Sequence, residues 1–199
     1  MASKRLLFYG GSFDPPHTGH RELLKAAMRA VEPDLTLIIP TGLSPFKNRV
    51  RTSFWDRVRM SRLTFSGIDN VRVSTIEGRG WRSYTMKTVR KLLKKYPGYE
   101  LFMLIGSDML TSFSKWHLHR RIMANVTLVA GGRDDEHRKA MEAAAVQLRK
   151  DGGKVMILSF DPVDISSTRV RQLIESGADV SGFVSREVQE HIRKRGLYR

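Results

Sequence analysis

The chain has 199 residues, 41% of them hydrophobic and 28% charged, and its 35 Lys and Arg against 20 Asp and Glu give a net charge of +15. It has no cysteine, which excludes disulfides, cysteine-bound metals and thiol catalysis. No apolar run approaches the roughly 20 residues that a membrane span needs. The length predicts one domain over residues 1–199, and a strand pattern directly after MASKR leaves no room for a signal peptide, so we expect a cytoplasmic protein.

The positive charge would attract polyanions, either nucleic acids or phosphorylated substrates. The basic residues are scattered, and no zinc-finger or RNA-recognition signature accompanies them. This distribution favours a solvated basic surface and predicts neither a nucleic-acid nor a membrane partner. One group of these residues comprises Arg49, Arg51, Arg57, Arg59 and Arg62.

Short apolar runs alternate with helical patterns along the chain. The runs are continuous, as in strands that are buried on both faces of a parallel sheet. Strands are expected at residues 6–9, 35–39, 71–73, 101–105, 126–130 and 155–158.

Helical patterns lie between these runs. His20, Leu23, Leu24, Ala27 and Val31 share one face of the first helix. Further helices are expected from residue 86 to Pro97-Gly98, and within DEHRKAMEAAAVQLRKDGG, STRVRQLIESG and SREVQEHIRKRG. The alternation predicts an α/β fold with one doubly wound parallel sheet, whose ligands bind where the strands end.

The loop after the first expected strand, GGSFDPPHTGH, has the residues of a phosphate site. Gly10 and Gly11 allow a sharp turn and a close approach to a ligand, and the two prolines stiffen the loop. We expect Thr18 to cap a helix that begins at the next residue, whose free N–H groups attract an anion.

His17 and His20 flank this helix start, and both imidazoles can donate hydrogen bonds to phosphate oxygens. His20 lies on the apolar face of its helix, and taken alone it indicates a core histidine more than a ligand; it is the pair with His17 that favours phosphate binding. A zinc site lacks further ligands, because His117 and His119 lie far along the chain. The spacing matches neither a Walker loop nor GxGxxG.

Other expected loops have suitable polar groups too. Lys47 can reach a phosphate, Asp108 can accept from ribose hydroxyls or close an Asx turn, and Trp116 can stack on a flat ring or serve as packing. A second phosphate site is predicted at a helix start that has three hydroxyls and an arginine. Its residues are Ser166, Ser167, Thr168 and Arg171.

Several motifs together resemble one family. GGSFDPPHTGH is similar to the (H/T)xGH motif of the nucleotidyltransferase superfamily, and in its details to the nicotinate-nucleotide adenylyltransferase family of bacterial NAD biosynthesis. PTGLSPFK, SYTMKTVRKL, LIGSDML, ISSTRVR and the terminal LYR resemble further motifs of that family. Phe46 stands where the family usually has histidine, which leaves the nucleotide contact of this loop to Lys47.

The resemblance implies a Rossmann-like nucleotidyltransferase fold and a set of site residues. Catalysis would fall to His17, His20, Lys47 and Arg171. ATP would contact Gly10, Gly11, Ser12, Phe13, Gly106, Asp108, Ser166, Ser167 and Thr168. The mononucleotide would contact Thr41, Ser83, Tyr84, Thr85 and Trp116.

The reaction that this resemblance implies is adenylyl transfer from ATP to nicotinate mononucleotide, giving deamido-NAD and pyrophosphate. The mononucleotide phosphate would attack the α-phosphate in line, without a covalent intermediate, and Mg²⁺ would accompany ATP. The sequence leaves open a preference for nicotinamide mononucleotide. It also leaves open a related activity such as that of pantetheine-phosphate adenylyltransferase or a cytidylyltransferase.

Overall fold

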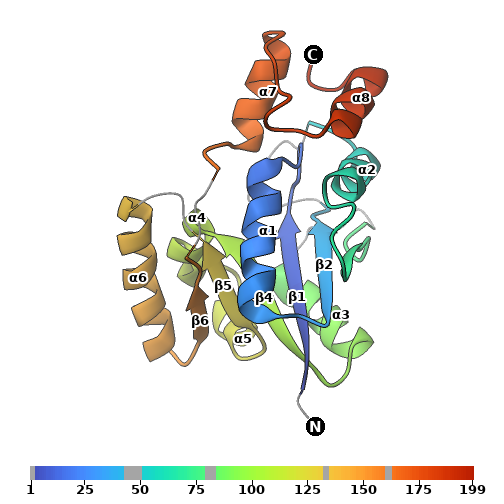
Figure 1. Ribbon diagram of the computed structural model, residues 1–199. Coiled ribbons are helices and arrows are strands. Elements are labelled where there is room, and N and C mark those ends of the chain that lie inside the picture. The colour runs from blue at the N-terminus through green and yellow to red at the C-terminus, as the bar shows by residue number, and fades with distance from the viewer. Residues whose placement is uncertain (1–2, 43–50, 79–83, 132–134, 160–162) are drawn as a thin grey trace.

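The computed structural model describes residues 3–42, 51–78, 84–131, 135–159 and 163–199, with the backbone alone for 135–137. Within these residues one parallel sheet has six strands in the order β3-β2-β1-β4-β5-β6, as Figure 1 shows. The strands are β1 Lys4–Gly11, β2 Leu35–Pro40, β3 Val71–Val73, β4 Tyr99–Gly106, β5 Thr127–Gly131 and β6 Lys154–Ile157. All six expected strands are confirmed, with ends that differ by at most two residues.

Helices follow most strands. They are α1 Thr18–Val31, α2 Phe54–Thr64, α3 Thr85–Lys95, α4 Ser107–Thr111, α5 His119–Met123, α6 Asp135–Lys150, α7 Ser167–Glu175 and α8 Arg186–Arg195, with a 3₁₀ turn η1 at Phe113–Lys115. None of the described helices is long and apolar enough to cross a membrane.

The central strand β1 explains why its apolar run is continuous. Leu6 and Phe8 pack into the cluster on one face of the sheet, together with side chains of α3, α5 and α6. Leu7 and Tyr9 pack on the other face, against α1. Because successive side chains of a strand point to opposite faces, a strand that is covered on both sides has no polar position between its ends.

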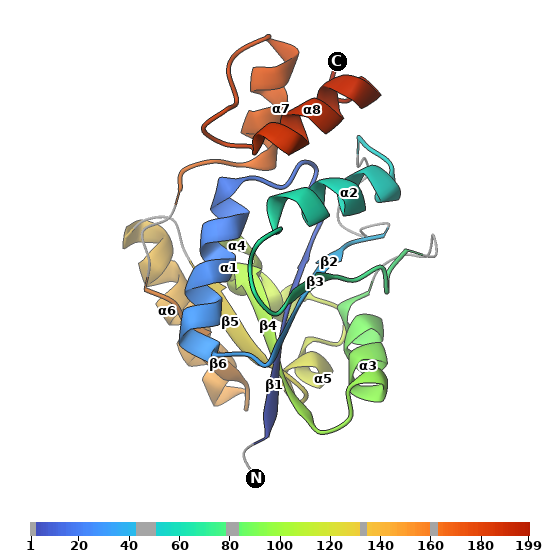
Figure 2. The same ribbon diagram turned by 45° about the vertical axis from the view of Figure 1, so that its right-hand side comes forward.

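A third apolar cluster joins α2, α7 and α8 beyond the carboxyl ends of the strands (Figures 1 and 2). Its buried members are Met60, Ile165, Val170, Val184, Val188, Ile192 and Tyr198. The segment from Ile165 to Tyr198 is thereby packed over the edge of the sheet where ligands of such folds bind.

Two local expectations differ from the structure. Helix α1 begins at Thr18 with His17 as its N-cap residue, one residue earlier than expected. Helix α2 was not predicted from the sequence, although Ser53 accepts a hydrogen bond from the N–H of Asp56 at 3.1 Å. This Ser-x-x-Asp spacing is a known signal for a helix start.

Asp56 also fastens α8 to α2. Its carboxylate contacts the side chain of Ser53 at 2.6 Å, His191 Nε2 at 3.1 Å and Arg195 Nε at 3.2 Å. Burial alone would raise the pKa of Asp56, but these hydrogen bonds and the charge of Arg195 outweigh it, so the pKa lies below its ordinary value of 3.8. The ionised carboxylate therefore stabilises the folded chain.

We expect Asp56→Asn to lower the free energy of unfolding by about 1–3 kcal/mol at pH 7, because it leaves Ser53, His191 and Arg195 without a charged acceptor. A depressed carboxylate pKa stabilises the fold above the ordinary pKa and loses this effect as the pH falls below about 4. The difference between the two proteins should thus shrink toward pH 2, as measured by urea unfolding. A difference that stays constant across this range would contradict the role of the charge.

Candidate active site

The strand order reverses between β1 and β4, the point at which ligands bind in open parallel sheets. Pairing between these strands ends at Tyr9 and Leu104. Beyond it, β1 continues along β2 and β4 continues along β5. Gly10 lies just past this separation, is exposed, and has no atom within 4 Å of where a Cβ would stand. The backbone of Gly10 is therefore accessible to a ligand.

The next residues support the loop from below. A Cβ on Gly11 would lie 3.0 Å from the ring of Phe13, so a glycine is needed there for close packing. Phe13 is 1% exposed, and its backbone is left-handed with φ of 49°. Its ring lies edge-on to the ring of His20, with the two ring centroids 5.1 Å apart. The side chain of Phe13 thus packs beneath the loop, against the ring of His20.

The two predicted histidines converge. The ring centroids of His17 and His20 lie 3.7 Å apart. Nδ1 of His20 accepts a hydrogen bond from the main-chain N–H of His17 at 3.2 Å. Because this nitrogen accepts, the ring proton belongs on Nε2, and His20 presents an N–H donor away from the backbone.

The helix start itself is less open than the sequence predicts. The N–H of Thr18 donates to the carbonyl of Phe183 at 2.8 Å, and the N–H groups of His20 and Arg21 turn back to the carbonyl of His17. The N-terminus of α1 is thus partly closed by the segment between α7 and α8. An anion here would depend chiefly on the histidine side chains.

Helix α7 brings the second predicted phosphate site to the same loop. Ser166 caps this helix by accepting from the N–H of Arg169, and Ser167 donates to the carbonyl of Pro15 at 2.8 Å. Arg171 donates to the carbonyl of Asp14 at 2.7 Å, and to the hydroxyl of Thr168 at 3.0 Å. Both predicted phosphate sites therefore meet at residues 14–17.

The third strand end adds Gly106 and Asp108. Gly106 ends β4 and is the N-cap of α4, so that Asp108 lies exposed in the first turn of that helix. Its Oδ1 accepts from the N–H of the next residue, Met109, at 3.0 Å, which differs from an Asx turn because that turn is closed by the N–H two residues on. One carboxylate oxygen is thus held in place beside the carboxyl end of β4.

The residues expected to hold the mononucleotide ring lie at α3 and after η1. Tyr84 is the N-cap residue of α3, next to Thr85, and its ring lies 5.3 Å from that of His117. Trp116 is partly buried against Phe113, with ring centroids 5.2 Å apart. The contact between Tyr84 and His117 joins the start of α3 to the segment after η1, and the sequence analysis did not predict this contact.

Thr41 follows β2, and its N–H donates to the carbonyl of Gly11 at 2.8 Å. Its hydroxyl is buried without a partner among the described residues. Lys47, Phe46 and Ser83 lie outside the described residues. Among the residues that are described, no group of three or more His, Asp or Glu side chains could hold a metal ion.

Arg57 was expected to belong to a solvated basic surface, and this is wrong. It is 2% exposed and donates to the carbonyls of Ser12 at 2.9 Å and Gly42 at 3.3 Å. Burial lowers the pKa of Arg57, while the nearby Asp14 opposes that shift. Arg57 thus supports the loop from beneath, and the unrecognised start of α2 is why the sequence analysis missed it.

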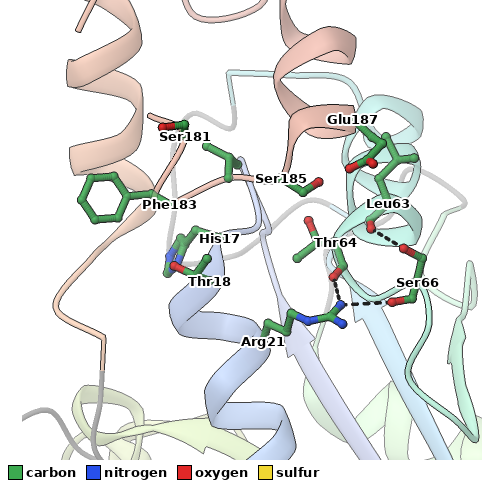
Figure 3. Close-up of a pocket in the computed structure, with 11 residues that line it drawn as sticks. His17, Thr18, Arg21, Leu63, Thr64, Ser66, Ser181, Phe183, Ser185 and Glu187 are labelled. Carbon is green, nitrogen blue, oxygen red and sulfur yellow. Dashed lines mark hydrogen bonds between the residues drawn. The ribbon is translucent and has the colours of Figure 1, made fainter. Parts of the chain in front are cut away.

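A pocket of about 280 Å³ borders His17 on the side of α1 that faces α2 (Figure 3). Ser181, Phe183 and Ser185 line this pocket beside the start of α1. Arg21 closes the other side by donating to the carbonyls at the end of α2. The pocket shows how closely the C-terminal segment covers the first turn of α1.

Comparisons with known proteins agree with this geometry. Residues 8–173 match the cytidylyltransferase-like family. A probable nicotinate-nucleotide adenylyltransferase of Gemmatimonas aurantiaca is 35% identical over 98% of this chain and 92% of its own length. Another, of Shouchella clausii, is 34% identical over 98% and 97%.

Among solved structures, a nicotinic acid mononucleotide adenylyltransferase of Plasmodium falciparum, complexed with NaAD, has a TM-score of 0.79 at 17% identity. It covers 98% of this chain and 97% of its own, which establishes the shared fold. The family model and the sequence identity of the relatives show the family to which the chain belongs. The chain belongs to the nicotinate-nucleotide adenylyltransferase family, within the cytidylyltransferase-like proteins.

Proposed function

We propose that the protein transfers an adenylyl group from ATP to nicotinate mononucleotide, forming deamido-NAD and pyrophosphate. The observation that carries this proposal is the meeting of the His17–His20 pair with the start of α7 at a single loop. Two phosphate-binding groups on one loop suit a reaction between two phosphorylated substrates. The names of the relatives support the same reaction.

The chemistry needs no nucleophilic side chain. A phosphate oxygen of the mononucleotide bonds to the α-phosphorus of ATP, while the bond from that phosphorus to the bridging oxygen of pyrophosphate breaks. Because the attacking phosphate is already anionic, catalysis consists of positioning and of stabilising the charge that develops on the phosphoryl oxygens.

His17 and His20 are proposed to donate to the α-phosphate oxygens. The hydrogen bond to Nδ1 of His20 directs its Nε2–H outward, so the donor is oriented before substrate arrives. Lys47 is proposed as a further cation on these oxygens. Such preorganised donors cost no reorganisation when the transition state forms.

The β- and γ-phosphates are proposed to bind at the start of α7. Arg171 uses part of its guanidinium on Asp14 and Thr168, and its remaining N–H groups are available to phosphate. The hydroxyls of α7 add donors at the same helix end. Mg²⁺ would enter with ATP as part of that substrate and keep most of its waters.

The pyridine ring is proposed to lie between Trp116 and the start of α3, where Ser83, Tyr84 and Thr85 would hold its carboxylate. Asp108 is proposed to accept from a ribose hydroxyl. The cytoplasmic location and the single domain over residues 1–199 stay predictions.

Pyrophosphate release from ATP, measured with different acceptors, tests the function. We expect turnover with nicotinate mononucleotide to exceed that with nicotinamide mononucleotide, and none with phosphopantetheine. A preference for the amide would move the assignment to the alternative mononucleotide. Turnover with phosphopantetheine alone would reject it.

We expect His20→Ala to lower kcat by about 10²-fold, the scale of losing one transition-state donor. Its midpoint of thermal unfolding should fall by only a few degrees, because the side chain of His20 is only half-buried. Turnover per folded molecule and thermal unfolding are measured on the same preparation. If stability falls and turnover per folded molecule does not, His20 is a structural residue.

We expect Arg171→Ala to weaken ATP binding by about 10- to 100-fold, the loss of a charged hydrogen bond, and nicotinate mononucleotide binding far less. Arg169→Ala is the matched control, because Arg169 lies on the same helix and is exposed. Isothermal titration calorimetry with ATP and with nicotinate mononucleotide measures the affinity of each variant for each substrate. Equal weakening of the two substrates would mean that the phosphate sites are misassigned.

A further inference from the structure

The side chain of Asp14 connects the loop before His17 with two distant parts of the chain. Its Oδ1 accepts from the phenol of Tyr198 at 2.7 Å and from the hydroxyl of Thr52 at 2.6 Å. Its Oδ2 accepts from the N–H of Arg51 at 2.9 Å. Asp14 is 4% exposed, so these contacts are shielded from water and define the position of the loop.

Tyr198 is the second-last residue of the chain, yet it is 5% exposed. Its ring packs in the cluster of α2, α7 and α8, which orients the hydroxyl toward the loop. Burial, together with the neighbouring Asp14 carboxylate, raises the pKa of Tyr198 well above its usual value. The phenol therefore stays protonated and remains a donor.

A buried carboxylate needs a reason beyond packing. Removing a charge from water is costly, and an apolar side chain of similar size often fills such a place at no loss of stability. Here the charge is balanced by the buried Arg57, while the carbonyl of Asp14 accepts from Arg171. The groups that donate to the Asp14 side chain come from the segment before α2 and from the residues after α8, so this carboxylate joins both to the loop before His17.

The same C-terminal region holds the helix start from the other side. The carbonyl of Phe183 accepts from the N–H of Thr18, and Phe183 lines the same pocket as His17 and Thr18 (Figure 3). Residues that follow α7 therefore contact this turn on both sides of His17, Tyr198 at Asp14 and Phe183 at Thr18.

We propose that Tyr198, acting through Asp14, is a positioning residue for the adenylyl transfer proposed above, on which this inference rests. The end of the chain holds the loop so that His17 and His20 reach the α-phosphate oxygens. Removing the Tyr198 hydroxyl lets the loop shift while both histidines remain present. A displacement of about 1 Å at such a site can cost on the order of 10²-fold in rate.

The test is Tyr198→Phe, which deletes one hydroxyl and keeps the ring. We expect kcat with ATP and nicotinate mononucleotide to fall about 10- to 100-fold. The KM for the mononucleotide should stay within about threefold, because the ring site at Trp116 is untouched. The midpoint of thermal unfolding should fall by about 3–12 °C, the loss of one hydrogen bond to a charged group, and activity is measured well below that midpoint.

Tyr99→Phe is the matched control. Tyr99 starts β4 at the opposite end of the sheet, where its partly buried ring contacts Tyr96. This variant should keep full kcat, which separates the Asp14 contact from a general effect of losing a phenol.

Asp14→Asn tests whether both residues act as one unit. The double variant with Tyr198→Phe should lose no more activity than the worse single variant, and fully additive losses would overturn the proposal. If Asp14→Asn fails to fold, Thr52→Val replaces it, because Thr52 donates to the same Oδ1.

The unaltered protein is assayed first. Absence of turnover with nicotinate mononucleotide rejects the proposed function, and the positioning role with it. Normal turnover per folded molecule in Tyr198→Phe rejects the positioning role alone, and leaves Tyr198 as a residue that only stabilises the fold.

Discussion

The hydrogen bonds to Asp14 are the constraint on which the rest of the site depends. They join the loop after β1 to the segment before α2, to α7 and to the last residues of the chain. Without them, the loop would be held to these segments by few other polar contacts, of which the bond from Ser167 to Pro15 is one. Both groups of proposed phosphate-binding residues are therefore linked through the side chain and the carbonyl of Asp14.

This arrangement also solves an electrostatic problem. A carboxylate beside a phosphate site repels the substrate unless cations balance it. Arg57 lies beneath the loop and Arg171 on its outer side, so the charge of Asp14 is compensated within the protein. The loop can then keep a carboxylate for its geometry without opposing the ATP binding that we propose.

The separation of β1 and β4 creates the place where these groups act. After Tyr9 and Leu104, β1 pairs only with β2 and β4 pairs only with β5. The two strands therefore separate, and Gly10 is exposed beside the gap in their pairing. The fold therefore provides access at its centre, and the loops supply the chemistry. The pairing of the His17 and His20 rings at the start of α1 follows from a three-residue spacing that one helical turn brings together.

The sequence by itself determined the strands and most of the longer helices, and it predicted two phosphate-binding motifs. Continuous apolar runs, the 3.6-residue period and capping residues are local signals, so they are readable without the fold. It also supported the family, through motifs spread along the chain. The exact helix start at Thr18 and the helix α2 were missed, because their signals are short.

Only the tertiary structure decided which groups meet. The contact from Tyr198 to Asp14 spans 184 residues, and that from Arg171 to Asp14 spans 157. No periodicity encodes such pairs, since they arise from how α2, α7 and α8 pack beyond the sheet. For the same reason the sequence could not tell that Arg57 is buried, because its burial depends on a loop 45 residues away folding over it.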